Sequence, residues 1–153
     1  VDLLLDPAGP GGERPVAMRY EIGLRLPAHC TASGKSLLAA LPPGQITERY
    51  ADGRFETLTS HSISSAEELA AELDQVRARG YAIDDALGML CFGAAVLDSS
   101  GRPAGALSVS MVKAAVDDAR AATATQAILE LARALTMRLG GPDRELTGLA
   151  PPA

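Results

Sequence analysis

Two stretches of the chain carry apolar residues at the three- and four-residue spacing of an amphipathic helix. In one of them Leu69, Leu73 and Val76 share a face. The sequence Ser-Ala-Glu-Glu at 65–68 precedes them as a capping box, in which a hydroxyl and a carboxylate satisfy free backbone amides. Gly80 follows as a residue suited to end a helix. The pattern predicts a helix that begins after residue 65 and ends at Gly80.

The other long helix is predicted at the C-terminal end. Two aspartates at 117–118 open it, and the Gly-Gly-Pro sequence after Leu139 ends it. Its leucines and isoleucine follow helical spacing, so we expect Ile128, Leu131, Leu135 and Leu139 to form its buried seam.

A shorter helix is expected from Thr31 to Leu41. Thr31 can cap it, Leu37, Leu38 and Leu41 form its apolar stripe, and two prolines stop it. Gly34 weakens its first turn, which indicates that the backbone there lies close to another part of the molecule.

Strand patterns fill the region between the second and last helices. Tyr81–Asp84 is a short expected strand, and Cys91–Leu97 is almost wholly apolar, as in a strand covered on both faces. After a turn at 98–101, Ala104–Met111 forms the return strand. Consecutive strands without a crossover helix predict an antiparallel sheet, and helices around it give an α+β fold.

The ends of the chain are expected to differ. Val1–Asp6 and Pro15–Leu26 have the pattern of a loose hairpin, separated by a Gly- and Pro-rich break. We expect one domain over residues 1–140, followed by a disordered tail over residues 141–153.

Composition excludes several classes of protein. The chain has 153 residues and two cysteines, which does not suit a disulfide scaffold, and no apolar run approaches the ~20 residues that span a bilayer. With 19 acidic and 14 basic residues the net charge is −5, so this segment lacks the basic face of a nucleic-acid binder. We expect a domain of the reducing cytoplasm, without a leader peptide and without membrane contact.

The start of the helix at Thr31 is a candidate anion site. The first amides of a helix lack partners, and small residues at 32–34 leave them uncovered. An ordinary helix start with close packing is the alternative. A phosphate loop is rejected, because His29 stands where that motif requires glycine before Gly34-Lys35. Lys35 is expected either in solvent or beside a carboxylate.

The return strand places two hydroxyls in line. Ser108 and Ser110 share one face with Ala106, while Leu107, Val109 and Met111 share the other. The serine face either meets solvent or forms the floor of a polar pocket. Asp84 and Asp85 precede Cys91 and suit a turn, although either carboxylate is also a candidate pocket residue.

Signatures of catalysis and of metal binding are weak. The two histidines, His29 and His61, lack the spacing of a metal site, and no nucleophile-elbow motif occurs. We therefore expect no enzyme, no cofactor and no metal. A thiol enzyme that uses Cys91 remains the least favoured alternative.

The ordered motifs resemble a known family. Gly23…Pro27, Thr-Ala-Ser-Gly-Lys at 31–35, the Gly80-Tyr81 pair and the Gly-Met-Leu-Cys sequence that ends at Cys91 resemble segments of IclR-type bacterial transcriptional regulators. The resemblance spans roughly Leu3 to Leu139. It implies the C-terminal effector-binding domain, with a GAF-like or profilin-like antiparallel sheet flanked by helices.

The same resemblance implies partners and a binding site. Members form homodimers and homotetramers, bind small organic or aromatic acids, and contact DNA through an N-terminal winged helix-turn-helix, which we expect to precede Val1. In members that bind small carboxylates, the matching positions are the amides of Ala32 and Ser33 and the side chains of Asp84, Cys91, Ser108 and Ser110. The segment after Tyr81 is shorter here than in most members, so Asp85 is an alternative to Asp84.

Three functions follow from these observations. The favoured one is a ligand-sensing and oligomerisation domain of a transcriptional regulator. An assembly domain with a vestigial pocket is the second, and the thiol enzyme is the third.

Overall fold

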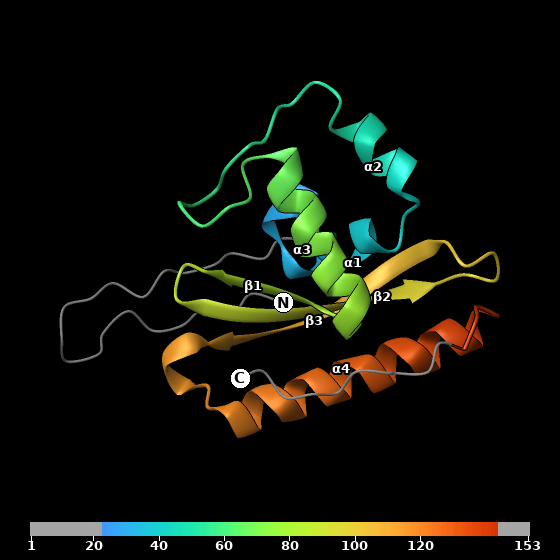
Figure 1. Ribbon diagram of the computed structural model, residues 1–153. Coiled ribbons are helices and arrows are strands. Elements are labelled where there is room, and N and C mark those ends of the chain that lie inside the picture. The colour runs from blue at the N-terminus through green and yellow to red at the C-terminus, as the bar shows by residue number, and fades with distance from the viewer. Residues whose placement is uncertain (1–22, 144–153) are drawn as a thin grey trace.

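The computed structural model describes residues 23–143, which form a three-stranded sheet and the helices around it (Figure 1). The elements in chain order are η1 (Ala28–Cys30), α1 (Ala32–Ala39), α2 (Pro43–Arg49), α3 (Ala66–Arg79), β1 (Ala82–Ala86), β2 (Met89–Leu97), β3 (Pro103–Val112), η2 (Lys113–Ala115) and α4 (Asp118–Arg138). This arrangement confirms the predicted α+β fold.

Some predictions concern residues outside this range. The predicted strand Val1–Asp6 and all but the end of the predicted strand Pro15–Leu26 lie outside the described residues, as does the tail from residue 144 onward. Gly23–Leu26, the described end of the second strand, has no strand conformation.

The sheet is antiparallel, in the order β1-β2-β3. β1 pairs only with the first half of β2, from Ala82 opposite Gly93 to Ala86 opposite Met89. β3 pairs along nearly the whole of β2. The strands lie within a few residues of the predicted bounds, because the turn at 98–101 and the apolar runs beside it fix the hairpin.

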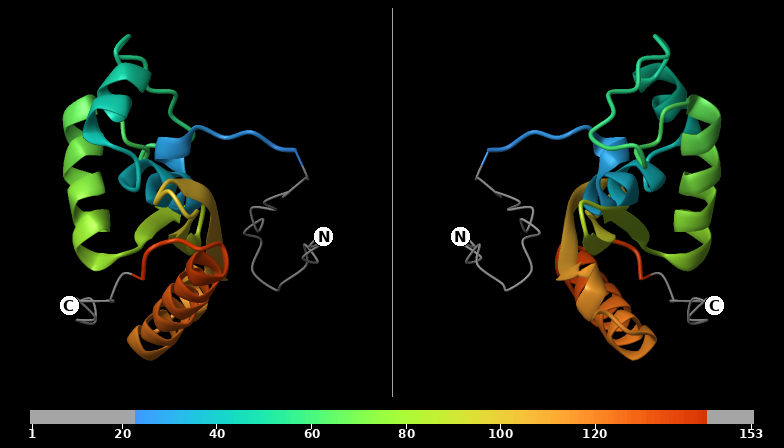
Figure 2. Two further views of the ribbon diagram at one scale, coloured as in Figure 1. Left: turned by 90° about the vertical axis from the view of Figure 1, so that its right-hand side faces the viewer. Right: turned by 90° about the vertical axis from the view of Figure 1, so that its left-hand side faces the viewer.

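Helices cover both faces of the central strand. Figure 2 shows α1 and α3 on one side of the sheet and α4 on the other. Ala32 of α1 and Val76 of α3 pack with Cys91 on the first face. On the other face Ile128 and Leu129 of α4 pack with Phe92, Ala94 and Val96. Covering on both faces explains why β2 is apolar at almost every position, as predicted.

Helices α1, α3 and α4 each begin at a residue whose side chain caps the first turn. Thr31 accepts a hydrogen bond from the amide of Gly34, Ser65 from that of Glu68, and Asp117 from that of Arg120. These caps confirm the predicted helix starts. In the capping box, the Glu68 carboxylate also accepts a hydrogen bond from the amide of Ser64, one residue before the N-cap.

The predicted seam of α4 is wrong except at Ile128. Leu131, Leu135 and Leu139 are 58%, 38% and 50% exposed. The buried positions of α4 are instead mostly small: Ala121, Thr125, Ile128, Leu129, Ala132 and Thr136.

The buried threonines of α4 are satisfied through hydrogen bonds. Thr136 Oγ1 accepts from the Leu97 amide at 3.0 Å, and Thr125 Oγ1 donates to the Ala121 carbonyl. The helix therefore lies close against the sheet through residues that the hydrophobic pattern did not select.

Two glycines let α1 lie close to its neighbours. A Cβ at Gly34 would collide with the Ala28 carbonyl, which confirms the close approach predicted at this position. A Cβ at Gly93, in the middle of β2, would lie 2.5 Å from the Ala32 carbonyl carbon and 2.7 Å from the Ser33 amide nitrogen. The first turn of α1 therefore rests directly on the backbone of β2.

Replacement of Gly93 by alanine should lower the free energy of unfolding by at least about 2 kcal/mol, because the added methyl group forces backbone apart from backbone. Chemical denaturation measures the change. Gly105→Ala is the matched control in β3, since a Cβ there meets nothing within 4 Å. It should change stability by less than about 1 kcal/mol. Equal losses of stability in the two variants would contradict the direct contact between the backbones of α1 and β2.

Candidate functional site

A hollow of about 320 Å³ opens on the sheet face that carries α1. Residues from α1, all three strands, the segment before η1 and the loop after Glu56 line it. The lining residues are Leu24, Leu26, Cys30, Thr31, Ala32, Ser33, Leu58, Thr59, Ser62, Asp84, Ala86, Leu87, Cys91, Ser108 and Ser110. Six of the seven predicted site residues therefore surround one space.

The first turn of α1 contributes unpaired amides. Thr31 accepts the amide of Gly34 through its hydroxyl at 3.0 Å and the amide of Lys35 through its carbonyl at 2.9 Å. Within residues 23–143, the amides of Ala32 and Ser33 have no such acceptor. Both residues line the hollow, so the positive end of the α1 dipole is available to an anion there.

The sheet contributes a polar floor. Ser108 lies opposite Gly93 and Ser110 lies opposite Cys91 in the β2–β3 register. The Cys91 thiol is 3.1 Å from the Ser110 hydroxyl, and both serines are exposed where they line the hollow. Because α1 rests on Gly93, its first turn lies next to Ser108. The predicted division of β3 into a serine face and an apolar face is correct, since Leu107, Val109 and Met111 pack toward α4.

Asp84 is the acidic residue of the hollow. It lies on β1 opposite Cys91, and not in the turn that its sequence suggested. Burial raises the pKa of the Asp84 carboxyl; Lys35 opposes this rise, while Asp85 and Glu72 add to it. A carboxyl with a raised pKa is more easily protonated and can then donate a hydrogen bond.

Asp85 does not line the hollow. Successive residues of a strand point to opposite faces, and the Asp85 carboxylate forms an ion pair with Lys113 outside the hollow. The structure thus places Asp84 at the hollow, and the alternative assignment to Asp85 is not supported by its position.

Lys35 is buried, contrary to the alternative that places it in solvent. Its Nζ donates to the Ile83 carbonyl and lies 3.4 Å from Glu72 Oε1. The expectation of a carboxylate partner is therefore the correct one. The lysine joins α1, α3 and β1 next to Asp84.

Sequence reasoning missed the apolar side of the hollow. Leu24, Leu26, Leu58 and Leu87 line it while remaining 52%, 41%, 45% and 48% exposed. All four lie outside the helices and strands of the structure, although Leu24 and Leu26 fall at the end of the strand predicted over residues 15–26. The only local signal is a leucine in a short turn, at Leu87.

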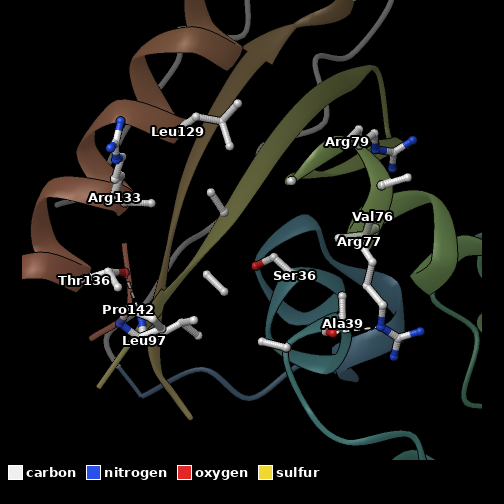
Figure 3. Close-up of a pocket in the computed structure, with 16 residues that line it drawn as sticks. Ser36, Ala39, Val76, Arg77, Arg79, Leu97, Leu129, Arg133, Thr136 and Pro142 are labelled. Carbon is white, nitrogen blue, oxygen red and sulfur yellow. Dashed lines mark hydrogen bonds between the residues drawn. The ribbon is translucent and has the colours of Figure 1, made fainter. Parts of the chain in front are cut away.

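A second hollow of about 220 Å³ lies between α1, α3 and α4 (Figure 3). Its arginines, Arg77, Arg79 and Arg133, each form an ion pair with a carboxylate. Its hydroxyls, on Ser36 and Thr136, are already hydrogen-bonded to the backbone. These polar groups are engaged within the fold, so the hollow beside Ala32 and Ser33 is the better candidate for a binding site.

Residues 23–143 have the features of neither a metal site nor a membrane span. Over that range, no group of three or more histidine, cysteine or acidic residues is arranged to hold a metal ion. None of the helices described there has the length and apolar character needed to cross a membrane.

Known proteins resemble this chain in sequence and in structure. The family described as bacterial transcriptional regulator IclR, C-terminal, matches residues 12–137. The HTH-type transcriptional regulator XynR of Escherichia coli K12 is 35% identical over 124 residues, which cover 79% of this chain and 49% of XynR. The transcriptional repressor IclR of the same organism is 32% identical over 127 residues, which cover 81% of this chain and 46% of the repressor.

A solved structure agrees with these relatives. The repressor BlcR of Agobacterium tumefaciens aligns with a TM-score of 0.74 and 38% identity, over 82% of this chain and 52% of BlcR. The chain therefore spans about half the length of the regulators that it matches. On sequence and fold together, this chain belongs to the IclR family of bacterial transcriptional regulators and corresponds to their C-terminal domain.

Proposed function

We propose that this chain is the ligand-sensing and oligomerisation domain of a cytoplasmic transcriptional regulator. A small organic or aromatic acid binds in the hollow beside Ala32 and Ser33. DNA is contacted through a winged-helix domain outside the 153 residues of this chain, as the resemblance to the family implies. The observation that supports this proposal is the convergence of unpaired amides and hydroxyls on one space.

The donors suit a carboxylate in both number and position. The amides of Ala32 and Ser33 come from α1, and the hydroxyls of Ser108 and Ser110 come from β3. A carboxylate accepts up to about four hydrogen bonds, and bonds to an ionised acceptor are the strong ones. We assign the acid's carboxylate to the space between the start of α1 and the serine face of β3.

Binding is proposed to act through a shift between arrangements of the assembled domain. An acid changes that equilibrium only by its different affinity for the two arrangements. The hollow joins α1, β1 and β3, together with the segments 24–26 and 57–62, so an acid that bridges them changes their relative stability. The attached DNA-binding domains then respond to the arrangement of the oligomer.

Assembly alone is a second candidate function. The exposed leucines of α4, Leu131, Leu135 and Leu139, favour it, because apolar side chains gathered on one helix suit contact with another surface. In that case the hollow is vestigial. A thiol enzyme is not proposed, since the Cys91 thiol is buried and hydrogen-bonded to Ser110, and the matched relatives are regulators.

The hydroxyls of Ser108 and Ser110 should supply much of the affinity for a carboxylate. Ser108→Ala/Ser110→Ala should weaken binding of a carboxylic acid by roughly a hundredfold or more, because each of the two hydrogen bonds to a charged group contributes about 1.5–3 kcal/mol. Isothermal titration calorimetry measures the affinity with a panel of small carboxylates. Both hydroxyls are exposed, so the variant should keep the fold of the parent.

The matched control is Ser99→Ala, an exposed serine in the turn between β2 and β3 that does not line the hollow. It should bind as the parent does. Equal affinity in the parent and the double variant would remove the proposed site. If no carboxylate binds the parent and the domain still sediments as a tight oligomer, assembly becomes the supported function.

The raised pKa of Asp84 should make the stability of the domain depend on pH. The folded domain holds a proton on Asp84 more tightly than the unfolded chain does, so ionisation of Asp84 costs stability as pH rises through its folded pKa. Asp84→Asn should therefore be more stable than the parent above that pKa, and the difference should vanish at acidic pH below the unfolded value. Thermal unfolding across pH measures this.

The same ionisation should oppose an anionic ligand. Affinity of the parent should rise as pH falls toward the pKa of Asp84, whereas Asp84→Asn should bind with constant affinity above about pH 6, where a small carboxylic acid is almost fully ionised. Asp85→Asn, whose side chain lies outside the hollow, should keep this pH dependence but move it to lower pH, because the charge of Asp85 adds to the raised pKa of Asp84. A parent profile that is flat, or one that Asp84→Asn leaves unchanged, would contradict the role of Asp84.

A further inference from the structure

We infer that the hollow selects acids with a bulky apolar body, branched or aromatic, over short acids, and that Leu87 is a specificity-determining residue that contacts this body. The inference rests on the proposed function and adds the class of ligand to it. Two features of the molecule support it: the exposed leucines that line the hollow, and the backbone conformation of Leu87.

The first feature is the division of the hollow into polar and apolar parts. The amides of α1 and the serines of β3 lie on the polar side. Leu24 and Leu26 come from the segment before η1, and Leu58 comes from the loop that precedes α3. Each remains about half exposed, so each has apolar surface that the part of the chain from 23 to 143 does not bury.

The size of the hollow agrees with a ligand larger than its carboxylate. About 320 Å³ is at the lower end of the range for small-molecule sites. A carboxylate held by the polar side fills only part of this space. The remainder lies against leucines, and burial of those leucines by the ligand supplies the gain in affinity.

The second feature is the turn between β1 and β2. Ala86 pairs with Met89, which leaves a two-residue loop of Leu87 and Gly88. Both residues have a positive φ, +54° at Leu87 and +73° at Gly88. Glycine and asparagine adopt this conformation readily, whereas a leucine is strained in it.

Both the backbone and the side chain of Leu87 are therefore in energetically unfavourable states. Its backbone is strained, and its side chain is 48% exposed where it lines the hollow. Strained residues of this kind gather at sites where the strained conformation serves a function. Contact with the apolar body of a ligand explains why a leucine occupies a turn position that suits asparagine.

The first part of the test compares acids of increasing apolar size. Acetate, butyrate, 4-methylpentanoate and phenylacetate present the same carboxylate with different bodies. Calorimetry should show affinity rising by about fourfold for each CH₂ group buried. Phenylacetamide, which lacks the charge, should bind much more weakly than phenylacetate.

The second part uses Leu87→Asn, which keeps a residue suited to positive φ and removes the apolar side chain. The variant should lose about tenfold in affinity for phenylacetate and less than twofold for acetate. Its thermal midpoint without ligand should equal or exceed that of the parent. Met137→Asn is the control, since Met137 is an exposed apolar residue on α4, away from the hollow, and it should keep the affinities of the parent.

The outcomes separate this inference from the proposed function. If no acid binds the parent, the proposed function fails and the inference fails with it. If all four acids bind with similar affinity, or short acids bind more tightly, the proposed function stands and the apolar selectivity is overturned. If Leu87→Asn binds phenylacetate as Met137→Asn does, the role of Leu87 is overturned.

Discussion

The absence of a side chain at residue 93 decides where α1 lies on the sheet. Backbone meets backbone at this point, because a Cβ on Gly93 would overlap the Ala32–Ser33 peptide. Gly93 also faces Ser108 across the β2–β3 ladder. One contact thus fixes both the depth of α1 and its distance from the serines. The geometry of the hollow depends on it.

The position of α1 on the sheet also determines which charged groups are buried near the hollow. The helix brings Lys35 into the interior, where the Ile83 carbonyl and Glu72 hold its charge. Burial of a charge is costly unless it is paired and hydrogen-bonded, and Lys35 has both kinds of partner. Asp84 lies beside this cluster with a raised pKa, chiefly because of its own burial. The hollow therefore joins fixed donors with one carboxyl whose charge responds to pH.

Most of the fold could be predicted from the sequence, because local signals agreed with the final packing. Thr31, Ser65 and Asp117 cap the helices as their residue types indicate. The apolar run of β2 correctly predicted cover on both faces. Hydrophobic spacing failed on α4, where small alanines and hydrogen-bonded threonines face the sheet and larger leucines do not.

The candidate site was predictable only in part, for physical reasons. Its polar members follow from strand periodicity and from the start of a helix, together with the resemblance to a family. Alternation along β1 separates Asp84 from Asp85, yet sequence alone did not show which of them faces α1. The leucines of the hollow lie in loops and turns, including Leu24 and Leu26 at the end of a predicted strand that has no strand conformation there. Leu87 became notable only through its backbone φ, which the structure supplies.

Nuclear magnetic resonance of the backbone amides tests the central claim most directly. In a ¹⁵N-labelled domain titrated with phenylacetate, the amide signals of Ala32 and Ser33 should move downfield and saturate together, as expected for donors to a carboxylate. Saturation with those two signals unmoved, or with the largest changes at residues of the hollow in Figure 3, would contradict the account.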